Sequence, residues 1–412
     1  MKITCKEQHD IQDSIYCLVS EILDYNIFIY QEENFYNIIV DYITEIIKIQ
    51  LNVLYENYGE EVIDSFISYS IINCFNNNKF NFIFRSQQSS GSNNINIGVI
   101  NNKLQYLDKY CNQEQNSDEW YITRHNYLTA SSMWKIFASV CAKNSLIYNK
   151  CLPLNLDKYN STNVNINSTL HWGHKYEPLS IKYYEFMYNT KIKEYGCIPH
   201  KKHHCMAASP DGINCDKTSS RYGRLLEIKN IVNRQITGIP KKDYWIQMQI
   251  QMEVCDLDDC DFLETRFVEY TSEHDFNLDG NFNTSTDKKP KGIMIAFSDI
   301  NNNIKYEYSP LNINKNQYDL WEKEITNINL NNNYTWFTNI YWKLDEVSCV
   351  LVKRNHAWFN MAIIEIKNVW NIIQTEKLNE SYKLRSPKKR KTNINQINNI
   401  IVEKCKIDIN SL

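Results

Sequence analysis

Two segments, Ser209-Pro210-Asp211-Gly212 and Leu225-Leu226-Glu227-Ile228-Lys229, decide the fold of this 412-residue chain. The second segment begins with apolar residues and predicts a short strand. Side chains alternate between the two faces of a strand, so Glu227 and Lys229 point the same way while Ile228 packs behind them. Asp211 falls at a strand end or turn, and the polar residues 214–222 are enough for a hairpin connection. The pattern therefore predicts neighbouring strands that bring two carboxylates and an amine together.

This combination of groups suits metal-assisted chemistry on a phosphodiester. Mg²⁺ and Mn²⁺ accept one or two carboxylates and keep several waters for the substrate and the nucleophile. A nearby lysine such as Lys229 can orient the attacking water or stabilise charge that builds up at phosphorus. Taken alone the pattern has little specificity, because a Glu-Ile-Lys strand is usually a solvated sheet edge.

Three further motifs stand in a fixed order around this centre. They are residues 120–132 (WYITRHNYLTASS), 172–178 (WGHKYEP) and 244–252 (YWIQMQIQM). Together with the two segments above, they resemble the YqaJ/lambda-exonuclease branch of the PD-(D/E)xK nucleases, which are phage and viral recombination nucleases that resect duplex DNA. The resemblance covers roughly residues 115–370.

The resemblance implies a restriction-endonuclease-like α/β fold, with a mixed central sheet flanked by helices. It makes Asp211 and Glu227 metal ligands, adds the carbonyl of Ile228 as a third ligand, and makes Lys229 the catalytic lysine. Glu177 matches the upstream acidic position of the family. The cofactor implied is Mg²⁺ or Mn²⁺, as one or two ions.

The residues around Glu177 also allow a second interpretation. They predict the first turn of a helix, where Pro178 is tolerated because its missing N–H would lack an intrahelical partner anyway. The apolar stripe of this helix would be Leu179, Tyr183, Phe186 and Met187. A carboxylate in a first turn often only complements the helix dipole, and on the local sequence alone that interpretation is favoured.

By resemblance, Arg124, Ser131 and Thr129 belong to a pocket for the terminal 5′-phosphate. A guanidinium forks onto phosphate oxygens, and a hydroxyl adds a short hydrogen bond. Residues 129–131 also predict a helix start, whose backbone N–H groups would attract an anion. The alternative is that Ser131 is an N-cap and Arg124 a surface charge.

The third motif predicts a helix beside the active site. Helical spacing places Gln247 and Gln251 on one face together with Tyr244. The resemblance implies roles at the site for Tyr244 and Gln247, and Gln249 belongs to the same motif. The inward-facing apolar positions are Trp245, Met248, Met252 and Cys255.

Charge and composition divide the chain into three predicted regions. Residues 1–110 hold 7 Lys/Arg and 14 Asp/Glu, a net charge of −7, and predict a mostly helical unit with residues 87–102 as its linker. Residues 111–375 are the predicted nuclease domain. Residues 376–412, with a net charge of +5, predict a flexible tail whose basic run at 388–391 suggests nuclear import, a DNA tether or a solvated tail.

The thirteen cysteines predict neither disulfides nor an iron–sulfur cluster. Their spacing is irregular and their number odd, so we expect them to be reduced. Related nucleases with a cluster have three cysteines close together near the C-terminus, whereas only Cys349 and Cys405 lie in the last hundred residues here. Another group allows either a zinc site or, preferably, a plain strand pair: Cys197, His200, His203, His204, Cys205 and Cys215.

We therefore predict a metal-dependent 5′→3′ DNA exonuclease that resects duplex ends for recombination, repair or degradation of foreign DNA. The alternatives are a structure-directed or single-strand DNA endonuclease, and a non-catalytic DNA-binding protein on the same fold. Expected partners are DNA, an annealing protein or helicase, and further copies of the chain. Because the chain has no uninterrupted apolar run and no signal-peptide pattern, we expect a soluble intracellular protein without membrane contact, in the host cytoplasm, a viral factory or the nucleus.

Overall fold

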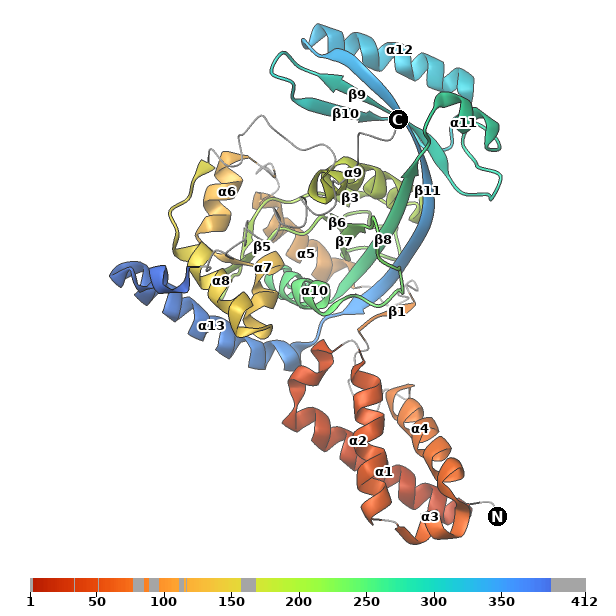
Figure 1. Ribbon diagram of the computed structural model, residues 1–412, viewed down its shortest axis with the longest axis vertical. Helices are drawn as coiled ribbons and strands as arrows, with labels where there is room; N and C mark the ends of the chain where they lie inside the picture. The colour runs from red at the N-terminus through yellow and green to blue at the C-terminus, as the bar shows by residue number, and fades with distance from the viewer. Residues whose placement is uncertain are drawn as a thin grey trace, which may run out of the picture.

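The computed structural model describes residues 3–32, 34–50, 52–76, 85–88, 96–110, 115, 117–156 and 168–386. Their fold is of the predicted α/β class, with a mixed sheet flanked by helices (Figure 1). The basic run at 388–391 lies outside the described residues.

The main sheet has the strand order β10-β9-β11-β8-β7-β6-β3, and β1 also pairs with β11. Strands β7 and β8 run parallel, and the other pairs are antiparallel. The strand bounds are β1 Gln87–Gln88, β3 Ile192–Lys193, β6 Gly212–Asn214, β7 Leu225–Asn230, β8 Asp259–Glu269, β9 Lys291–Ser298, β10 Ile304–Tyr308 and β11 Thr335–Lys353.

Strand β11 is the longest in the described chain and joins two parts of the sheet. Its first half pairs with β9 and its second half with β8, with register shifts between Trp336 and Thr338 and between Leu344 and Glu346. The outer strands therefore extend as an arm above the body, where helices α11 Glu273–Leu278 and α12 Lys315–Asn331 cover them (Figure 1). The predicted strands and helix of this region are confirmed, although β11 begins twelve residues before the predicted Val347.

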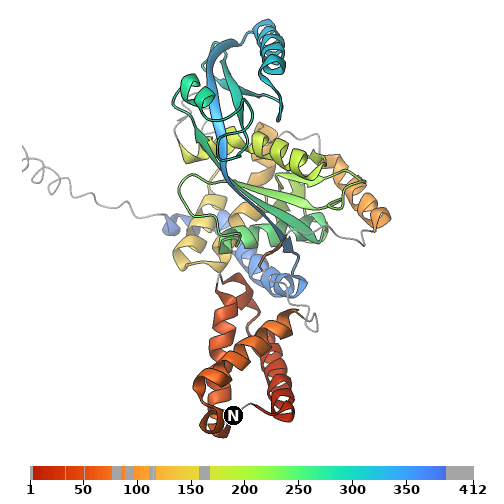
Figure 2. The ribbon, with the colours of Figure 1, turned by 90° about the vertical axis from the view of Figure 1, so that its right-hand side faces the viewer.

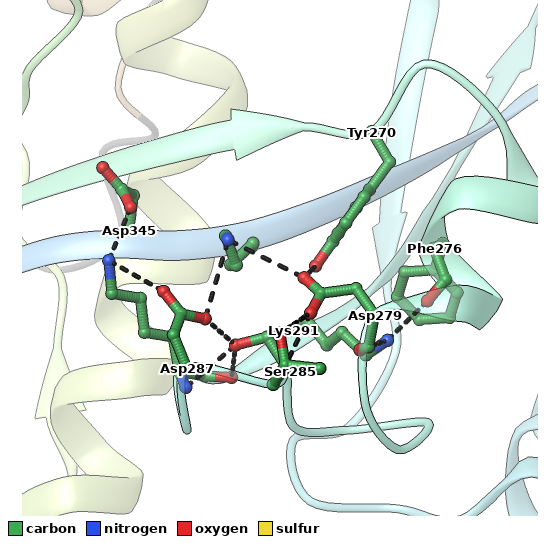
Figure 3. Close-up of polar contacts among 10 residues, drawn as sticks. Tyr270, Phe276, Asp279, Ser285, Asp287, Lys291 and Asp345 are labelled. Carbon is green, nitrogen blue, oxygen red and sulfur yellow. Dashed lines mark hydrogen bonds and ion pairs between the residues drawn. The ribbon is translucent and has the colours of Figure 1, made fainter.

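A network of charged and polar groups holds the base of the arm together (Figure 3). Buried Lys291 donates from its Nζ to the carbonyl of Phe276 at 2.5 Å and lies 4.2 Å from the centre of that ring. Asp279 accepts from the Tyr270 hydroxyl at 2.6 Å and from the backbone N–H of Thr286 at 2.8 Å. These bonds lower the pKa of Asp279, with the Thr286 hydroxyl as the largest cause. A loop that would otherwise be mobile is thereby fixed to β8 and β9.

Helices surround the body of the sheet. Helix α9 Thr169–Tyr188 packs against β7 and β8, while α10 Lys242–Cys255 packs between the main sheet and a small sheet. The small sheet has the order β2-β5-β4, formed by Leu128–Thr129, Met206–Ala208 and Ile198–Pro199. The remaining helices of the body are α5 Ile97–Leu107, α6 Asp118–His125, α7 Ala130–Met133, α8 Val140–Cys151 and α13 His356–Asn379, followed by the 3₁₀ segment Ser381–Arg385.

The acidic N-terminal region is helical, as predicted. Isoleucines at helical spacing are buried between α1 Cys5–Tyr25, α2 Phe35–Gln50 and α4 Glu60–Asn76, with α3 Asn52–Tyr58 beside them. These helices project away from the sheet (Figure 2). Contact with the body runs through the 3₁₀ segment Ile27–Gln31, which packs on α13 and α10, and through an ion pair of 2.7 Å between Lys242 and Glu32.

One sequence expectation in this region is wrong. Residues 87–102 do not form a continuous linker, because Gln87 and Gln88 pair with β11 and helix α5 already begins at Ile97. The side chain of Asn96 caps that helix by accepting from the N–H of Val99 at 3.2 Å. The polar composition of the segment thus hid a capped helix. No helix among the described residues is long and apolar enough to cross a membrane.

Candidate active site

The hairpin of β6 and β7 brings Asp211 beside Glu227 and Lys229, as the sequence predicted. Gly212 pairs with Leu226, which places Asp211 next to the middle of β7. The backbone N–H of Ile228 donates to Asp211 Oδ2 at 2.7 Å. A Cβ at Gly212 would meet Ile192 Cγ2 at 2.2 Å, so only glycine lets β3 approach this closely. The close packing of β3 on β6 fixes the position of the Asp211 turn.

Glu227 is fully buried and every hydrogen bond it accepts comes from a nitrogen donor. Its Oε1 accepts from Lys229 Nζ and from Gln247 Nε2 at 2.7 Å. Its Oε2 accepts from Gln251 Nε2 at 2.7 Å. Ile228 points to the opposite side, into an apolar cluster with Leu226 and Leu263. Strand alternation and helical spacing thus produce the predicted grouping, with one face polar and the other apolar.

Negative charge accumulates strongly here. Burial, followed by repulsion from Glu227 and Glu177, raises the pKa of Asp211 well above its usual value. Burial also raises the pKa of Glu177 to about 7, with attraction to Lys229 opposing the shift. Burial alone would lower the pKa of Lys229, but attraction to Glu227 and Asp211 outweighs it, and the pKa rises. A further positive charge would therefore stabilise this centre.

Glu177 lies near the centre, although its place in its helix differs from the prediction. Helix α9 begins at Thr169, where Ser168 caps it by accepting from the N–H of His171 at 3.1 Å, so Glu177 lies mid-helix and not in a first turn. Pro178 is a helix-interior proline and has no N–H to donate to the carbonyl of His174. Because Glu177 is not in a first turn, the helix-dipole interpretation is wrong.

The predicted apolar stripe of α9 is correct only in part. Leu179 and Tyr183 are buried against the sheet, but Phe186 and Met187 are more than half exposed. The last turn of the helix therefore extends past the edge of the sheet.

Helix α10 presents two faces, and the sequence motif belongs to both. Gln247 and Gln251 point to Glu227, and the ring centre of Tyr244 lies 5.0 Å from Lys229 Nζ. Gln249 points elsewhere. Its amide donates to the carbonyl of Lys353 at 2.9 Å, and its oxygen accepts from the N–H of Asn355 at 2.7 Å. Gln249 therefore fixes α10 to the start of α13 and does not belong to the carboxylate centre.

Arg124 and Ser131 meet as predicted, at the side of a cavity of about 500 Å³. Arg124 Nη2 donates to Ser131 Oγ at 3.0 Å, and Nη1 donates to Ser209 Oγ at 3.4 Å. The guanidinium carbon lies 4.1 Å from the ring centre of Trp120, whose indole N–H donates to the same Ser209 oxygen at 3.3 Å. Ser209 precedes Asp211 by two residues, so the cavity adjoins the carboxylate centre.

The helix start predicted at residues 129–131 is much shorter than expected. Helix α7 has only four residues and continues as a 3₁₀ segment, Trp134–Phe137. Ser131 lies inside this turn and is not its N-cap, while the hydroxyl of Thr129 pairs with that of Ser132 at 3.0 Å. Thr129, Ser131 and Ser132 all line the cavity. Any anion in the cavity would thus be held by side chains and not by a long helix.

The cysteine and histidine group resembling zinc ligands is better described as the strand pair. Cys197 and Cys205 are buried in apolar clusters beside β4 and β5. Within the described ranges, no three His, Cys, Asp or Glu side chains form an arrangement ready to hold a metal. The zinc interpretation therefore has no geometric support among the residues described.

A hard divalent cation nevertheless fits the chemistry of the carboxylate centre. Mg²⁺ is commonly held by one or two carboxylates plus waters, so a set of three such side chains is not required. Asp211, Glu227 and the carbonyl of Ile228 are hard oxygen donors on neighbouring strands, and the raised pKa of Asp211 reflects excess negative charge. Binding would exchange the contact between Lys229 and Glu227 for a contact with the ion.

Residues 119–258 match the model of the family described as the YqaJ-like viral recombinase domain. The chain contains a YqaJ-like viral recombinase domain. The matched stretch includes Arg124, Ser131, Glu177, Asp211, Glu227, Lys229, Tyr244 and Gln247. The resemblance predicted from the motifs is thereby confirmed.

A relative among curated proteins and two solved structures are also similar to this chain. An uncharacterized protein of Acanthamoeba polyphaga mimivirus is 32% identical over 310 residues, which cover 66% of this chain and 55% of that protein. The chain thus spans about half the length of this relative. An alkaline exonuclease from Laribacter hongkongensis is 17% identical, with a TM-score of 0.37, covering 65% of this chain and 98% of its own. A phage-related exonuclease from Haemophilus somnus is 14% identical, with a TM-score of 0.32, covering 64% and 99%.

Sequence reasoning missed Ser209 as a neighbour of Arg124, and Gln251 as a second amide on Glu227. Ser209 stands in the quoted Ser-Pro-Asp-Gly motif, but only the tertiary fold shows that its hydroxyl faces Arg124. The spacing of Gln247 and Gln251 was the available signal for the second amide, because residues four apart share a helix face.

Proposed function

We propose that this protein is a metal-dependent DNA nuclease that degrades duplex DNA from its 5′ ends. The match to the YqaJ-like viral recombinase domain supports a nuclease. The observation that supports the site most directly is the fully buried Glu227 carboxylate, grouped with Asp211 and Lys229. A decayed site would not need to retain this costly arrangement.

In this proposal Asp211, Glu227 and the Ile228 carbonyl hold one or two Mg²⁺ or Mn²⁺ ions, with Glu177 contributing a further carboxylate. When bound, such an ion supplies Lewis acidity toward the phosphodiester and lowers the pKa of a water. Lys229, released from Glu227, orients the attacking water and offsets charge at phosphorus. Gln247 and Gln251 keep Glu227 in place, and Tyr244 packs beside Lys229.

The exonuclease direction is supported by the cavity that adjoins the carboxylate centre. Arg124, Ser131 and Ser209 form a cluster of donors, and Ser209 is only two residues from Asp211. A 5′-phosphate held by this cluster would place the first phosphodiester near the carboxylates. Cleavage there would proceed 5′ to 3′ and leave a 3′ single strand. An annealing protein or helicase as partner, and a ring of several copies, remain predictions.

The test is digestion of a linear duplex that carries one labelled 5′-phosphate, with Mg²⁺, with EDTA, and with Asp211→Ala. We expect metal-dependent release of mononucleotides from the labelled end and none from the variant. Internal nicking would instead support the structure-directed or single-strand endonuclease. Absence of cleavage with any divalent metal would favour a non-catalytic DNA-binding protein. The mimivirus relative makes infected cells the natural setting, and the compartment remains a prediction.

A further inference from the structure

The cavity beside Arg124 is lined by a second buried cation that the family motifs do not include. Lys150, near the end of α8, lines this cavity together with Arg124, Ser131 and Lys135. Its Nζ donates to the backbone carbonyl of Arg124 at 2.7 Å. An ammonium carries three N–H donors, so this single bond leaves it able to donate to an anion in the cavity.

The charges around the cavity are unbalanced. The described residues that line it include Arg124, Lys135, Lys150 and two histidines, His125 and His174, and none of them is a carboxylate. Nearby ion pairs elsewhere on α8 differ, since Lys143 faces Glu365 at 4.0 Å. Positive charge without a carboxylate beside it is costly in a partly buried place, unless an anion from outside completes it.

We infer that Lys150 is a specificity-determining residue of this cavity, which selects a terminal phosphate monoester over a terminal hydroxyl. The inference rests on the proposed function for the identity of the ligand, a 5′-phosphorylated DNA end. Arg124 supplies the forked donor that fits phosphate oxygens, and Lys150 adds a point charge behind it. A phosphate monoester carries nearly two negative charges at neutral pH, so two cations discriminate it from an uncharged hydroxyl more strongly than one.

The electrostatics of Lys150 agree with an incomplete site. Burial, and then repulsion from Arg124 and Lys377, lower the pKa of Lys150 to about 8, with Cys197 opposing the shift. Burial, and then repulsion from Lys150 and Lys377, also lower the pKa of His125. An arriving phosphate favours the charged form of Lys150, so binding becomes weaker as the pH rises through about 8 and Lys150 loses its proton.

A binding experiment without catalysis tests this inference. Short duplexes that differ only in a 5′-phosphate or 5′-hydroxyl are titrated with protein in EDTA, and fluorescence anisotropy gives the ratio of their Kd values. For the wild type at neutral pH we expect a preference of about tenfold or more for the phosphate. Lys150→Met should lower this ratio to about twofold, while Lys143→Met, on the same helix but outside the cavity, should leave it unchanged.

The Lys150→Arg variant separates a direct role from a structural one. Arginine keeps its charge at high pH, so this variant should retain the phosphate preference at about pH 9, where the wild type loses most of it. An unchanged ratio in Lys150→Met overturns the inference. So does a lowered ratio that Lys150→Arg does not restore at any pH, because Lys150 would then only cap the end of α6.

Failure of the inference and failure of the proposed nuclease are distinguishable. If the wild type cleaves DNA but its end preference is the same in Lys150→Met, only the inference fails. If no metal supports cleavage but the phosphate preference still depends on Lys150, the nuclease proposal fails and the phosphate site stands.

Discussion

The two charged centres of this molecule adjoin each other through Ser209 and Asp211, yet their charges are met in opposite ways. In the carboxylate centre, the protein itself supplies the partners: Glu227 accepts from Lys229 and from two amides of α10. In the cavity, the charges of Arg124 and Lys150 have no carboxylate beside them among the described lining residues. One centre is nearly complete before substrate arrives, and the other is completed by the substrate.

This contrast separates chemistry from recognition. Groups that must act on the reacting atoms need fixed positions, and internal hydrogen bonds provide them. Groups that must recognise a terminal anion gain specificity when only that anion neutralises them. Substitutions in the carboxylate centre should therefore reduce turnover on every DNA end, whereas substitutions in the cavity should act mainly on phosphorylated ends.

The largest effect is expected for Lys229→Ala. It removes the amine proposed to assist the attacking water, and cleavage should fall by about 10³-fold or more on both kinds of DNA end. Glu227 keeps its bonds to Gln247 and Gln251, so the variant should remain folded. Single-turnover digestion measures the loss, and thermal unfolding serves as the control. Retained cleavage in a folded variant would remove Lys229 from the chemistry.

A smaller and selective effect is expected for Arg124→Met. Loss of the forked donor should lower kcat/KM by about 10²-fold on 5′-phosphorylated duplexes and by only a few-fold on 5′-hydroxyl duplexes. Methionine keeps a long apolar side chain against Trp120. Parallel digestion of the two substrates gives both values. Equal losses on both ends would contradict the separation of recognition from chemistry.

The sequence predicted the carboxylate centre well because short-range geometry determines it. Strand alternation places Glu227 and Lys229 together, and the polar segment 214–222 is a natural hairpin that returns to Asp211. Helical spacing likewise predicts that Gln247 and Gln251 share a face. Each of these relations depends on residues close in sequence, so periodicity and turn composition are enough to predict them.

The cavity was predicted only in part, because its members come from separate elements. Lys150 reaches the carbonyl of Arg124 across 26 positions, and Ser209 reaches the same residue across 85. No periodicity links such positions. The helix start at Glu177 failed for a different reason: Pro178 is a frequent first-turn residue, and its place inside a longer helix is tolerated only because tertiary packing stabilises α9.

The comparison can be sharpened with Gln251→Met, for which we expect a loss of about tenfold in kcat on both DNA ends. The substitution removes the hydrogen bond to Glu227 Oε2 while keeping a similar volume, so the carboxylate gains freedom to rotate. The matched control is Gln249→Met on the opposite face of α10. Because Gln249 bonds the backbone at Lys353 and Asn355, its loss should lower the free energy of unfolding by about 1–3 kcal/mol and leave kcat unchanged. Reversed outcomes would assign the two glutamines to the wrong faces.

The smallest effect is expected for Ser209→Ala, at the point where the two centres join. Its hydroxyl accepts long bonds from Arg124 at 3.4 Å and from the Trp120 indole at 3.3 Å, so each contributes little. Loss of the hydroxyl should raise KM for 5′-phosphorylated duplexes about threefold, through a less well oriented Arg124, and leave kcat as it is. Steady-state kinetics on both ends separates these parameters. A fall in kcat on both substrates would mean that Ser209 acts on the Asp211 turn, and recognition and chemistry would then share a residue and not merely adjoin.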